Sequence, residues 1–513
     1  MVLDYVILGL YVLGIVAITF YTKNRSKSVK DFLLAGKNGL NGWMSAFAYG
    51  TTYFSAVIFI GYAGKFGAQY HLAAVWIGIG NAIIGSLIAW KVLAKRTKVM
   101  TSRLSSKTMP EFFEKRYGSK SLKLSSAIVI FIFLIPYSAS VYNGLSSLFE
   151  IVFGIQGWII MIALALLTAL YLFFGGYFAT ALSDFIQGII MLIGVVIMVF
   201  FFLNSSYVSW DLTGLNWFTF NSKNTGIYGD TISLLSLILL TSFGVWALPQ
   251  TIHKYYAVRD DKSIKQGMIV STLFALIIGF GAYFVGGVST KFAADVVIGM
   301  DNTVPQMLYL VIPAGITGVI AVLILSASMS TLSSVSLASA SVVAIDIYKG
   351  KINQKASDKK VNIIMRILCL VFIVISVVLA ILNEEFGISA IAYLMGLSWG
   401  TLAGCFIGPY IIGLFWKGVT KASVWASIIG SLVLTVALTI FFGYDKMNYV
   451  CSFGLAIKTG IGCSPLVGVI CMIYSMVITP LVSLFTKKPD EKTIENSFAT
   501  NEHSAEKEQV VAE

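Results

Sequence analysis

Ala327-Ser328-Met329-Ser330-Thr331-Leu332-Ser333-Ser334 lies within an apolar run that extends from about residue 316 to residue 345. Hydroxyl groups are unusually dense here for a segment that otherwise has the composition of a lipid-soluble helix. On a helix, residues 327, 330, 331 and 334 share one stripe and Ser333 lies at its edge, because neighbours on a helix face are three and four residues apart. Such a stripe is typical of close helix packing or of an oxygen cage for a hard cation. The stretch alone favours packing, so the cation hypothesis depends on the rest of the chain.

The composition indicates a membrane protein. Of 513 residues, 57% are hydrophobic and only 12% are charged, whereas soluble domains have about a quarter of charged residues. Apolar runs recur along the whole chain, which predicts one all-α polytopic membrane domain. The first run follows Met1-Val-Leu-Asp, which has no basic residue, and it is long enough to span a bilayer. We therefore expect an uncleaved first helix and not a cleavable signal peptide.

We expect about thirteen transmembrane helices, each long enough to cross the hydrocarbon core. They are predicted at residues 4–22, 42–66, 73–92, 124–150, 157–176, 182–204, 231–252, 266–289, 314–345, 362–383, 388–416, 422–443 and 464–486.

The distribution of Lys and Arg predicts the orientation. If the N-terminus is outside, the outer loops hold only Lys65, Lys223, Lys291, Lys446 and Lys458, which leaves 31 of the 36 basic residues inside. The inner loops then include the basic clusters at 91–123, 254–265 and 349–366. We therefore expect a multi-pass protein of the cell (inner) membrane. By the positive-inside rule, its N-terminus is outside and its C-terminus is cytoplasmic. The net charge of +12 then comes from basic inner loops that lie against anionic lipid head groups. No nucleic acid is expected as a partner.

Features outside the spans lead to three further expectations. Residues 99–123 contain Thr108-Met-Pro-Glu, which predicts a short cytoplasmic amphipathic helix with Pro110 in its first turn. The polar tail at 487–513 is predicted to be disordered. Cys451 and Cys463 share the last outer loop, where they are either bridged or free.

Helix-breaking residues occur at corresponding places in two spans. The second span contains Gly50-Thr51-Thr52, and the seventh contains Gly244 and an interior Pro249, all of which weaken a helix. Kinks of this kind are common in membrane helices. However, each of these spans is the first of a group of five, and paired interruptions point to an inverted-repeat transporter with a midplane binding site. The halves share no residue-level similarity, so the repeat is inferred from the order of the spans.

Asp184 and four aromatic residues are further candidates for function. Asp184 begins the sixth span, where a carboxylate is costly and is usually paired or functional; the alternative is a solvated helix N-terminus. Tyr53, Tyr137, Trp246 and Trp399 lie in mid-span positions, where they either pack or line a substrate pocket. The three His residues form no metal-ligand pattern.

These motifs resemble the sodium:solute symporter family. The resemblance rests on Gly50-Thr-Thr-Tyr-Phe-Ser55, on Phe174-Gly-Gly-Tyr before Ala181-Leu-Ser-Asp184-Phe-Ile-Gln187, on the break at Pro249 and on Met329-Ser-Thr-Leu-Ser-Ser334. It covers nearly all the spans. It implies the leucine-transporter fold, with a 5+5 inverted repeat after an extra N-terminal helix. The implied divisions are an extra N-terminal helix with an inner loop (1–40), a first five-helix repeat (41–204) and an outer loop (205–229). They continue with a second five-helix repeat (230–416), two C-terminal helices (417–486) and a cytoplasmic tail (487–513).

The resemblance also implies cation sites. The main sodium site would use backbone carbonyls of Thr51, Phe54 and Ala327 together with the hydroxyls of Ser330 and Thr331. A second site, present in some members, would use Asp184, Ser330, Ser333 and Ser334. Sodium is a hard cation that prefers oxygen ligands, and an interrupted helix frees carbonyls to supply them. One or two sodium ions per transport cycle are therefore expected, and coupling to protons stays open.

The expected substrate pocket contains Tyr53, Ser55, Tyr137, Trp246 and Gln250. Proline carriers that resemble this chain have an aspartate in place of Tyr53, whereas Tyr137 matches a tyrosine of theirs. Sialic acid carriers have an arginine in the fourth span, where this chain has none. The stretch Ala247-Leu-Pro249-Gln-Thr is closer to pantothenate carriers. The choice between a small amino acid and an organic carboxylate therefore stays open, and sialic acid or a sugar is the alternative.

Taken together, the sequence predicts a secondary active transporter that imports a small organic solute with sodium influx by alternating access. Its expected partners are the solute and the lipid bilayer, and the transport unit is expected to be a monomer. An intramembrane enzyme would need a nucleophile and a base, but no His or second carboxylate lies at membrane depth beside Asp184. A channel is not excluded by the sequence.

Overall fold

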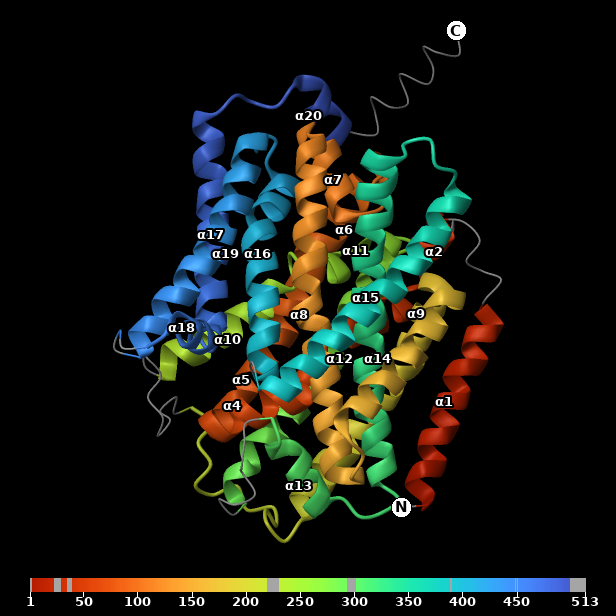
Figure 1. Ribbon diagram of the computed structural model, residues 1–513, viewed down its shortest axis with the longest axis vertical. Helices are drawn as coiled ribbons and strands as arrows, with labels where there is room; N and C mark the ends of the chain where they lie inside the picture. Colours follow the sequence, from red (N-terminus) through yellow and green to blue (C-terminus); the bar gives the residue numbers. More distant parts are fainter. Residues whose placement is uncertain are drawn as a thin grey trace.

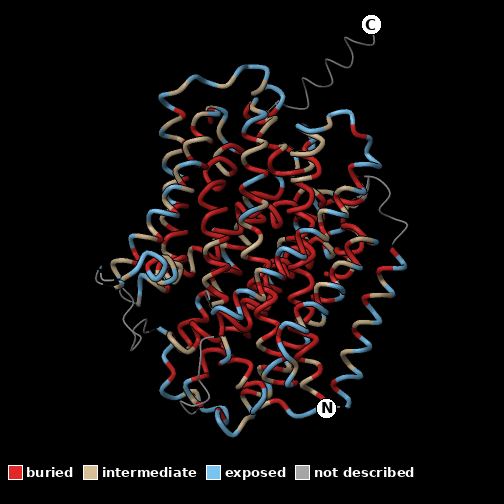
Figure 2. Tube along the Cα trace, viewed as in Figure 1, coloured by how far each residue is buried: buried red, intermediate tan, exposed pale blue. Residues whose placement is uncertain are grey.

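The computed structural model describes residues 2–22, 29–34, 39–218, 230–292, 301–387, 390–447, 449 and 451–498. Apart from one isolated bridge between Leu40 and Val258, the regular structure of this part of the chain is helical (Figure 1). Most of the long helices run along the long axis of the bundle, and buried residues concentrate in its interior (Figure 2). The prediction of an all-α protein is confirmed.

The helices of the N-terminal half follow one another with short connections. They are α1 (Val2–Thr22), α2 (Val29–Leu34), α3 (Gly42–Tyr53), η2 (Val57–Tyr62), α4 (Ala63–Tyr70), η3 (His71–Ala74), α5 (Val75–Gly80), η4 (Asn81–Ile88), η5 (Trp90–Ala94), α6 (Lys95–Arg103), α7 (Met109–Tyr117), α8 (Lys120–Phe153) and α9 (Gly157–Asn204).

The C-terminal half contains α10 (Asp230–Gly244), α11 (Pro249–Ala257), α12 (Asp261–Gly287), η6 (Val288–Lys291), α13 (Thr303–Val311), α14 (Thr317–Ser341), η7 (Val342–Ile352), α15 (Asp358–Phe386), α16 (Ile391–Phe415), α17 (Lys421–Lys446), α18 (Phe453–Ile461), α19 (Ser464–Phe485) and α20 (Glu491–Phe498).

Eleven helical segments of the described residues are long and apolar enough to cross a membrane. Two of them, Val57–Arg103 and Gly157–Asn204, have 47 and 48 residues, more than twice the roughly 20 residues that one crossing needs. Each is divided by a backbone break, at His71 (φ 54°) and at Gly176 (φ 64°). With both divided, the bundle has thirteen crossings, as the sequence predicted.

Both predicted interruptions are present. Helix α3 ends at Tyr53, Phe54 has extended dihedrals (φ −102°, ψ 102°), and helical structure resumes at Val57. Helix α10 ends at Gly244, and α11 starts at Pro249 after an extended Leu248 (φ −78°, ψ 124°). Proline has no backbone N–H, so it can begin a helix but cannot continue the preceding one.

The hydroxyl-rich stretch lies in α14, in the interior of the bundle. In the most apolar stretch of 18 residues of this segment, 94% of the residues are buried, compared with 22% in the corresponding stretch of α1. Helix α1 lies at the edge of the bundle (Figures 1 and 2). Helix α14 contacts α1, α3, α8, α9 and α15. Its hydroxyl groups therefore face protein and not lipid.

At the end of the bundle that holds α7 and α20 (Figure 1), one prediction is confirmed and another is revised. The expected amphipathic helix is α7, whose N-cap Thr108 accepts a hydrogen bond from the Glu111 N–H. The tail differs from the predicted disorder, because residues 491–498 form α20 and the Phe498 ring packs on the Arg116 guanidinium at 4.8 Å. Residues 499–513 lie outside the described part.

The cysteines of the last loop are both free thiols, since Cys451 and Cys463 form no disulfide.

Candidate functional site

The interrupted end of α3 faces the hydroxyl stripe of α14. The Ser330 hydroxyl lies 3.1 Å from the Thr51 carbonyl oxygen and 3.2 Å from that of Ala327. The Thr331 hydroxyl lies 3.3 Å from the Thr51 oxygen. All four residues are fully buried. Carbonyls in the last turn of a helix have no partner further along it, so the Thr51 oxygen is free to receive these groups.

The spacing of these oxygens is slightly shorter than the spacing that a hard cation requires, so a bound cation would have to separate them by a few tenths of an ångström. Calcium, which is close to sodium in size, binds oxygens at 2.3–2.6 Å, so adjacent ligands at right angles are about 3.3–3.7 Å apart. The oxygens measured here are separated by 3.1–3.3 Å. Phe54, the fifth predicted ligand, lies in the extended segment directly after α3. The predicted ligand groups at Thr51, Ala327, Ser330 and Thr331 are thus brought together.

The group predicted around Asp184 contains an additional residue, Lys254 from α11. Asp184 is completely buried and its carboxylate lies 3.5 Å from the Lys254 ammonium, so it is not a solvated residue at a helix end. The same ammonium donates a hydrogen bond of 2.8 Å to the Ser334 hydroxyl. Ser333 instead donates to the Ser330 carbonyl at 2.9 Å. The inner-loop position that the sequence suggested for Lys254 is wrong, since only 1% of this residue is exposed.

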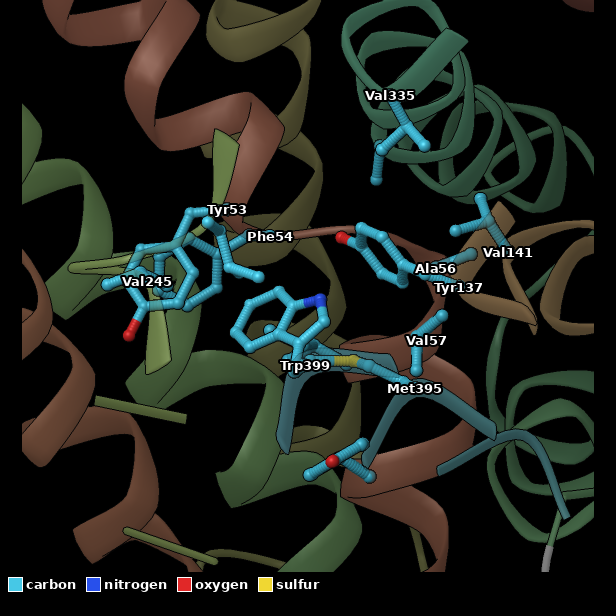
Figure 3. Packing of buried hydrophobic residues seen from close by; sticks show 14 of the residues in the cluster. Tyr53, Phe54, Ala56, Val57, Tyr137, Val141, Val245, Val335, Met395 and Trp399 are labelled. Carbon is cyan, nitrogen blue, oxygen red and sulfur yellow. The ribbon is translucent and has the colours of Figure 1, made fainter. Parts of the chain in front are cut away.

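Aromatic rings surround the break in α3. The Trp399 indole of α16 lies between Tyr53 and Tyr137, beside the segment that contains Phe54 and Val57 (Figure 3). Its ring centroid is 6.0 Å from that of Tyr53 and 5.5 Å from that of Tyr137. The indole N–H of Trp399 and the hydroxyl of Tyr137 are buried, and neither has a hydrogen-bond partner among the described residues. Two unused donors within an apolar enclosure are typical of a site that orients a small polar ligand.

The Tyr137 hydroxyl connects this aromatic cluster with the cation site. It lies near the hydroxyls of Ser55, in the break, and of Thr331, on the α14 stripe, but forms a well-aligned hydrogen bond with neither. Val245, from the second interruption, belongs to the same hydrophobic cluster as Tyr53 (Figure 3), and the Tyr53 hydroxyl donates to the Thr241 carbonyl of α10 at 2.7 Å. Both interrupted helices therefore face the same region of the bundle.

The chain can now be compared with known proteins. A profile of the sodium:solute symporter family matches residues 32–430. The chain belongs to the sodium:solute symporter family. This symporter is 28% identical to the osmoregulated proline transporter OpuE of Bacillus subtilis (strain 168) over 494 residues, which cover 94% of each chain. It is 27% identical to a sodium/proline symporter of Staphylococcus aureus over 506 residues, which cover 94% of this chain and 93% of that one.

The structural comparison agrees with the fold predicted for this symporter. A solved structure of a Na⁺-coupled sialic acid symporter, in a substrate-bound, outward-open state, has a TM-score of 0.72 at 17% identity and covers 95% of this chain and 99% of that chain. At this identity the likeness concerns the fold, which is the leucine-transporter fold. The family membership shows that the protein is a multi-pass membrane transporter that couples solute import to sodium.

The other predicted pocket residues of this symporter have varied surroundings. The Tyr53 hydroxyl donates to the Thr241 carbonyl at 2.7 Å, and the Ser55 hydroxyl accepts the Val57 N–H at 3.3 Å. The Trp246 indole donates to the Ile84 carbonyl at 3.1 Å and packs on Phe243. Gln250 is buried at the start of α11, and its side-chain oxygen has no partner.

The sequence does not assign the place of two residues of this symporter. Trp399 is a candidate aromatic residue in the sequence, but nothing local indicates that α16 brings it next to Tyr53. Lys254 was counted with the loop lysines. A signal was present, since Lys254 lies only five residues after Pro249 and a helix that starts there extends toward the membrane surface with Lys254 still in its second turn.

Proposed function

We propose that this symporter imports a small zwitterionic amino acid, with L-proline as the first candidate, using a sodium ion held between α3 and α14. The observation that carries the proposal is the shared use of one short segment. The carbonyl of Thr51 contacts Ser330 and Thr331, while Tyr53 and Phe54, two and three residues later, belong to the aromatic cluster. Binding of sodium at one end of this segment would therefore order the wall of the substrate pocket.

The chemistry of the pocket supports a compact, largely apolar solute. Tyr53, Phe54, Tyr137 and Trp399 pack together (Figure 3) and would enclose an apolar side chain when the cluster opens, while the donors of Tyr137 and Trp399 without a partner among the described residues suit a carboxylate. The two relatives give further support, because one is a proline transporter and the other is a sodium/proline symporter. The aspartate that proline carriers have in place of Tyr53 is absent here, so affinity for proline is the critical test.

We infer the orientation and the transport unit as follows. The basic residues of α6, α7 and the start of α8 gather at the end of the bundle that also holds α20 (Figure 1). By the positive-inside rule this end is cytoplasmic, which puts the N-terminus outside the cell membrane. We further propose a monomeric transport unit with the repeats at 41–204 and 230–416.

The test is uptake of radiolabelled L-proline into proteoliposomes with sodium outside. Pantothenate, sialic acid and glucose are added in excess as competitors, one at a time, with unlabelled L-proline as the reference. We expect competition by proline alone. If only pantothenate competes and is itself taken up, the substrate is an organic carboxylate. If sialic acid or glucose competes, the zwitterion proposal is wrong.

A further inference from the structure

The position predicted for a second sodium ion is filled by a side chain of the protein. The Lys254 ammonium lies 2.8 Å from the Ser334 hydroxyl and 3.5 Å from the Asp184 carboxylate, two of the groups predicted to bind that ion. It is enclosed, because Lys254 is 1% exposed and Asp184 is 0% exposed. The ring of Tyr177 lies 5.2 Å from the ammonium. An ammonium and a sodium ion both need oxygen ligands and a compensating negative charge.

The hydrogen bonds of Ser334 use its one proton and one of its two lone pairs. Thr52 gives its own proton to the Ala48 carbonyl at 2.7 Å, so the 2.8 Å contact between Thr52 and Ser334 uses the proton of Ser334. The Ser334 oxygen accepts from Lys254 at the same time. Of the two lone pairs of the Ser334 oxygen, one already accepts from the ammonium, so a sodium ion bound to the other would lie within a few ångströms of that ammonium.

The charge balance leads to the same result. Among the ion pairs of the described residues, Lys254 and Asp184 each have only the other as a partner. One buried carboxylate neutralises one cation. A second cation beside it would repel the ammonium within a few ångströms in a water-poor interior, where like charges interact strongly. The residues that would form a second sodium site therefore do not fit a sodium ion while Lys254 is in place.

We propose that Lys254 is a tethered cation that replaces the second sodium ion, so that this symporter binds and carries a single sodium ion per cycle. The inference rests on the proposed sodium-coupled function and specifies its stoichiometry. Ser334 connects the two cation positions, since it bonds to Thr52 at 2.8 Å, and Thr52 follows the Thr51 carbonyl of the main site. The ammonium thereby holds the end of α3 against α14 in every cycle without being transported.

A consequence for variants follows. The second carboxylate oxygen of Asp184 is buried without a hydrogen-bond partner. Removal of the ammonium would leave that carboxylate unneutralised in the region of the Ser334 hydroxyl, which the ammonium now contacts, and Ser333 is the adjacent hydroxyl-bearing residue of α14. These oxygens would then be free to bind a second sodium ion. Lys254→Ala should therefore gain a sodium site, and Lys254→Arg, which keeps the charge, should not.

The experiment counts sodium ions. Equilibrium dialysis with ²²Na⁺ on the purified full chain gives the number bound per chain, and dual-label uptake of ²²Na⁺ and radiolabelled L-proline in proteoliposomes gives the transport ratio. We expect one ion per chain and a ratio of one in the wild type. Two ions per chain, or two per proline, would overturn the inference, and this result needs no variant.

Variants of Lys254 and Asp184 test separately whether the ammonium excludes the second sodium ion. Lys254→Ala should bind two ions, Lys254→Arg one, and Lys254→Ala combined with Asp184→Asn one again, each checked for a monodisperse elution profile. A monodisperse Lys254→Ala protein that still binds one ion would show that the ammonium does not exclude sodium. If the wild type binds no sodium at all, the proposed function fails, whereas two ions leave that function intact and remove only the role of Lys254.

Discussion

At the scale of single residues, sodium recognition depends on a few oxygens whose alternative partners are visible in the structure. The Ser330 hydroxyl can bond to the Thr51 carbonyl at 3.1 Å or to the Ser326 carbonyl of its own helix at 2.9 Å. A hydroxyl with both options can be a helix-packing group and a cation ligand at different times. Substitution of serine by alanine separates the two roles. Helix packing tolerates the remaining methyl group, whereas a cation loses an oxygen ligand.

For the main sodium site we predict that Ser330→Ala or Thr331→Ala raises the sodium concentration needed for half-maximal uptake about tenfold or more, since one lost oxygen ligand costs about 1–3 kcal/mol. Expression should be unchanged. Ser328→Ala is the matched control, because Ser328 is equally buried but bonds only within α14, to the Ile324 carbonyl at 2.8 Å. Normal uptake at limiting sodium in both site variants would mean that the stripe only packs helices.

For the pocket we predict that Tyr137→Phe weakens apparent proline affinity about tenfold, the effect of removing one hydrogen bond to a charged group, and leaves sodium affinity within twofold. Tyr142→Phe is the control, since its hydroxyl is also buried without a partner one turn further along α8. Concentration series of proline and of sodium measure the two affinities separately. A shift in sodium affinity alone would place Tyr137 in the cation site instead.

At the scale of helices, the two interruptions follow from local chemistry, but their meeting does not. Gly50 with two threonines and Pro249 each weaken the helix that contains them, and both breaks were predictable from those residues alone. Lys254 and Asp184 are separated by 70 residues, and the contact between Trp399 and Tyr53 spans most of the chain. Such contacts depend on how α11, α14 and α16 pack, which no local pattern specifies. The same reason explains why docking of α20 was missed.

Helix α7 provides a prediction about stability. Thr108 caps α7 through the Glu111 N–H and also donates to the buried Asp346 carboxylate at 2.7 Å. Thr108→Val should lower stability by about 1–3 kcal/mol, because it removes the cap and leaves a buried carboxylate oxygen unpaired. Thr108→Ser should restore most of the loss. Thermal unfolding of purified protein gives the order, and equal melting temperatures for valine and threonine would contradict it.

At the scale of the whole molecule, the fold organises one polar path within an apolar bundle. The path runs from Thr51 through Thr52 and Ser334 to Lys254 and Asp184, toward the end that holds α7 and α20. Around it, apolar side chains form a continuous core. The composition and the apolar runs were enough to predict the bundle and its thirteen crossings, because a segment that crosses the hydrocarbon core must be long and apolar whether it faces lipid or other helices.

The topology can be tested by labelling single cysteines in a background without the native five. Asn216→Cys lies in the loop after α9, and Lys355→Cys lies between η7 and α15; both positions are exposed. We expect a membrane-impermeant maleimide to label position 216 in intact cells and position 355 only after the membrane is opened. The reverse pattern would invert the orientation.

The central claim is that sodium entry at the α3–α14 site drives solute import, and the most direct test is uptake of L-proline in proteoliposomes under imposed gradients. The account predicts accumulation above equilibrium with an inward sodium gradient, none with an inward proton gradient in choline medium, and a loss of accumulation in Ser330→Ala at limiting sodium. Accumulation driven equally by protons without sodium, or unaffected by Ser330→Ala, would contradict it.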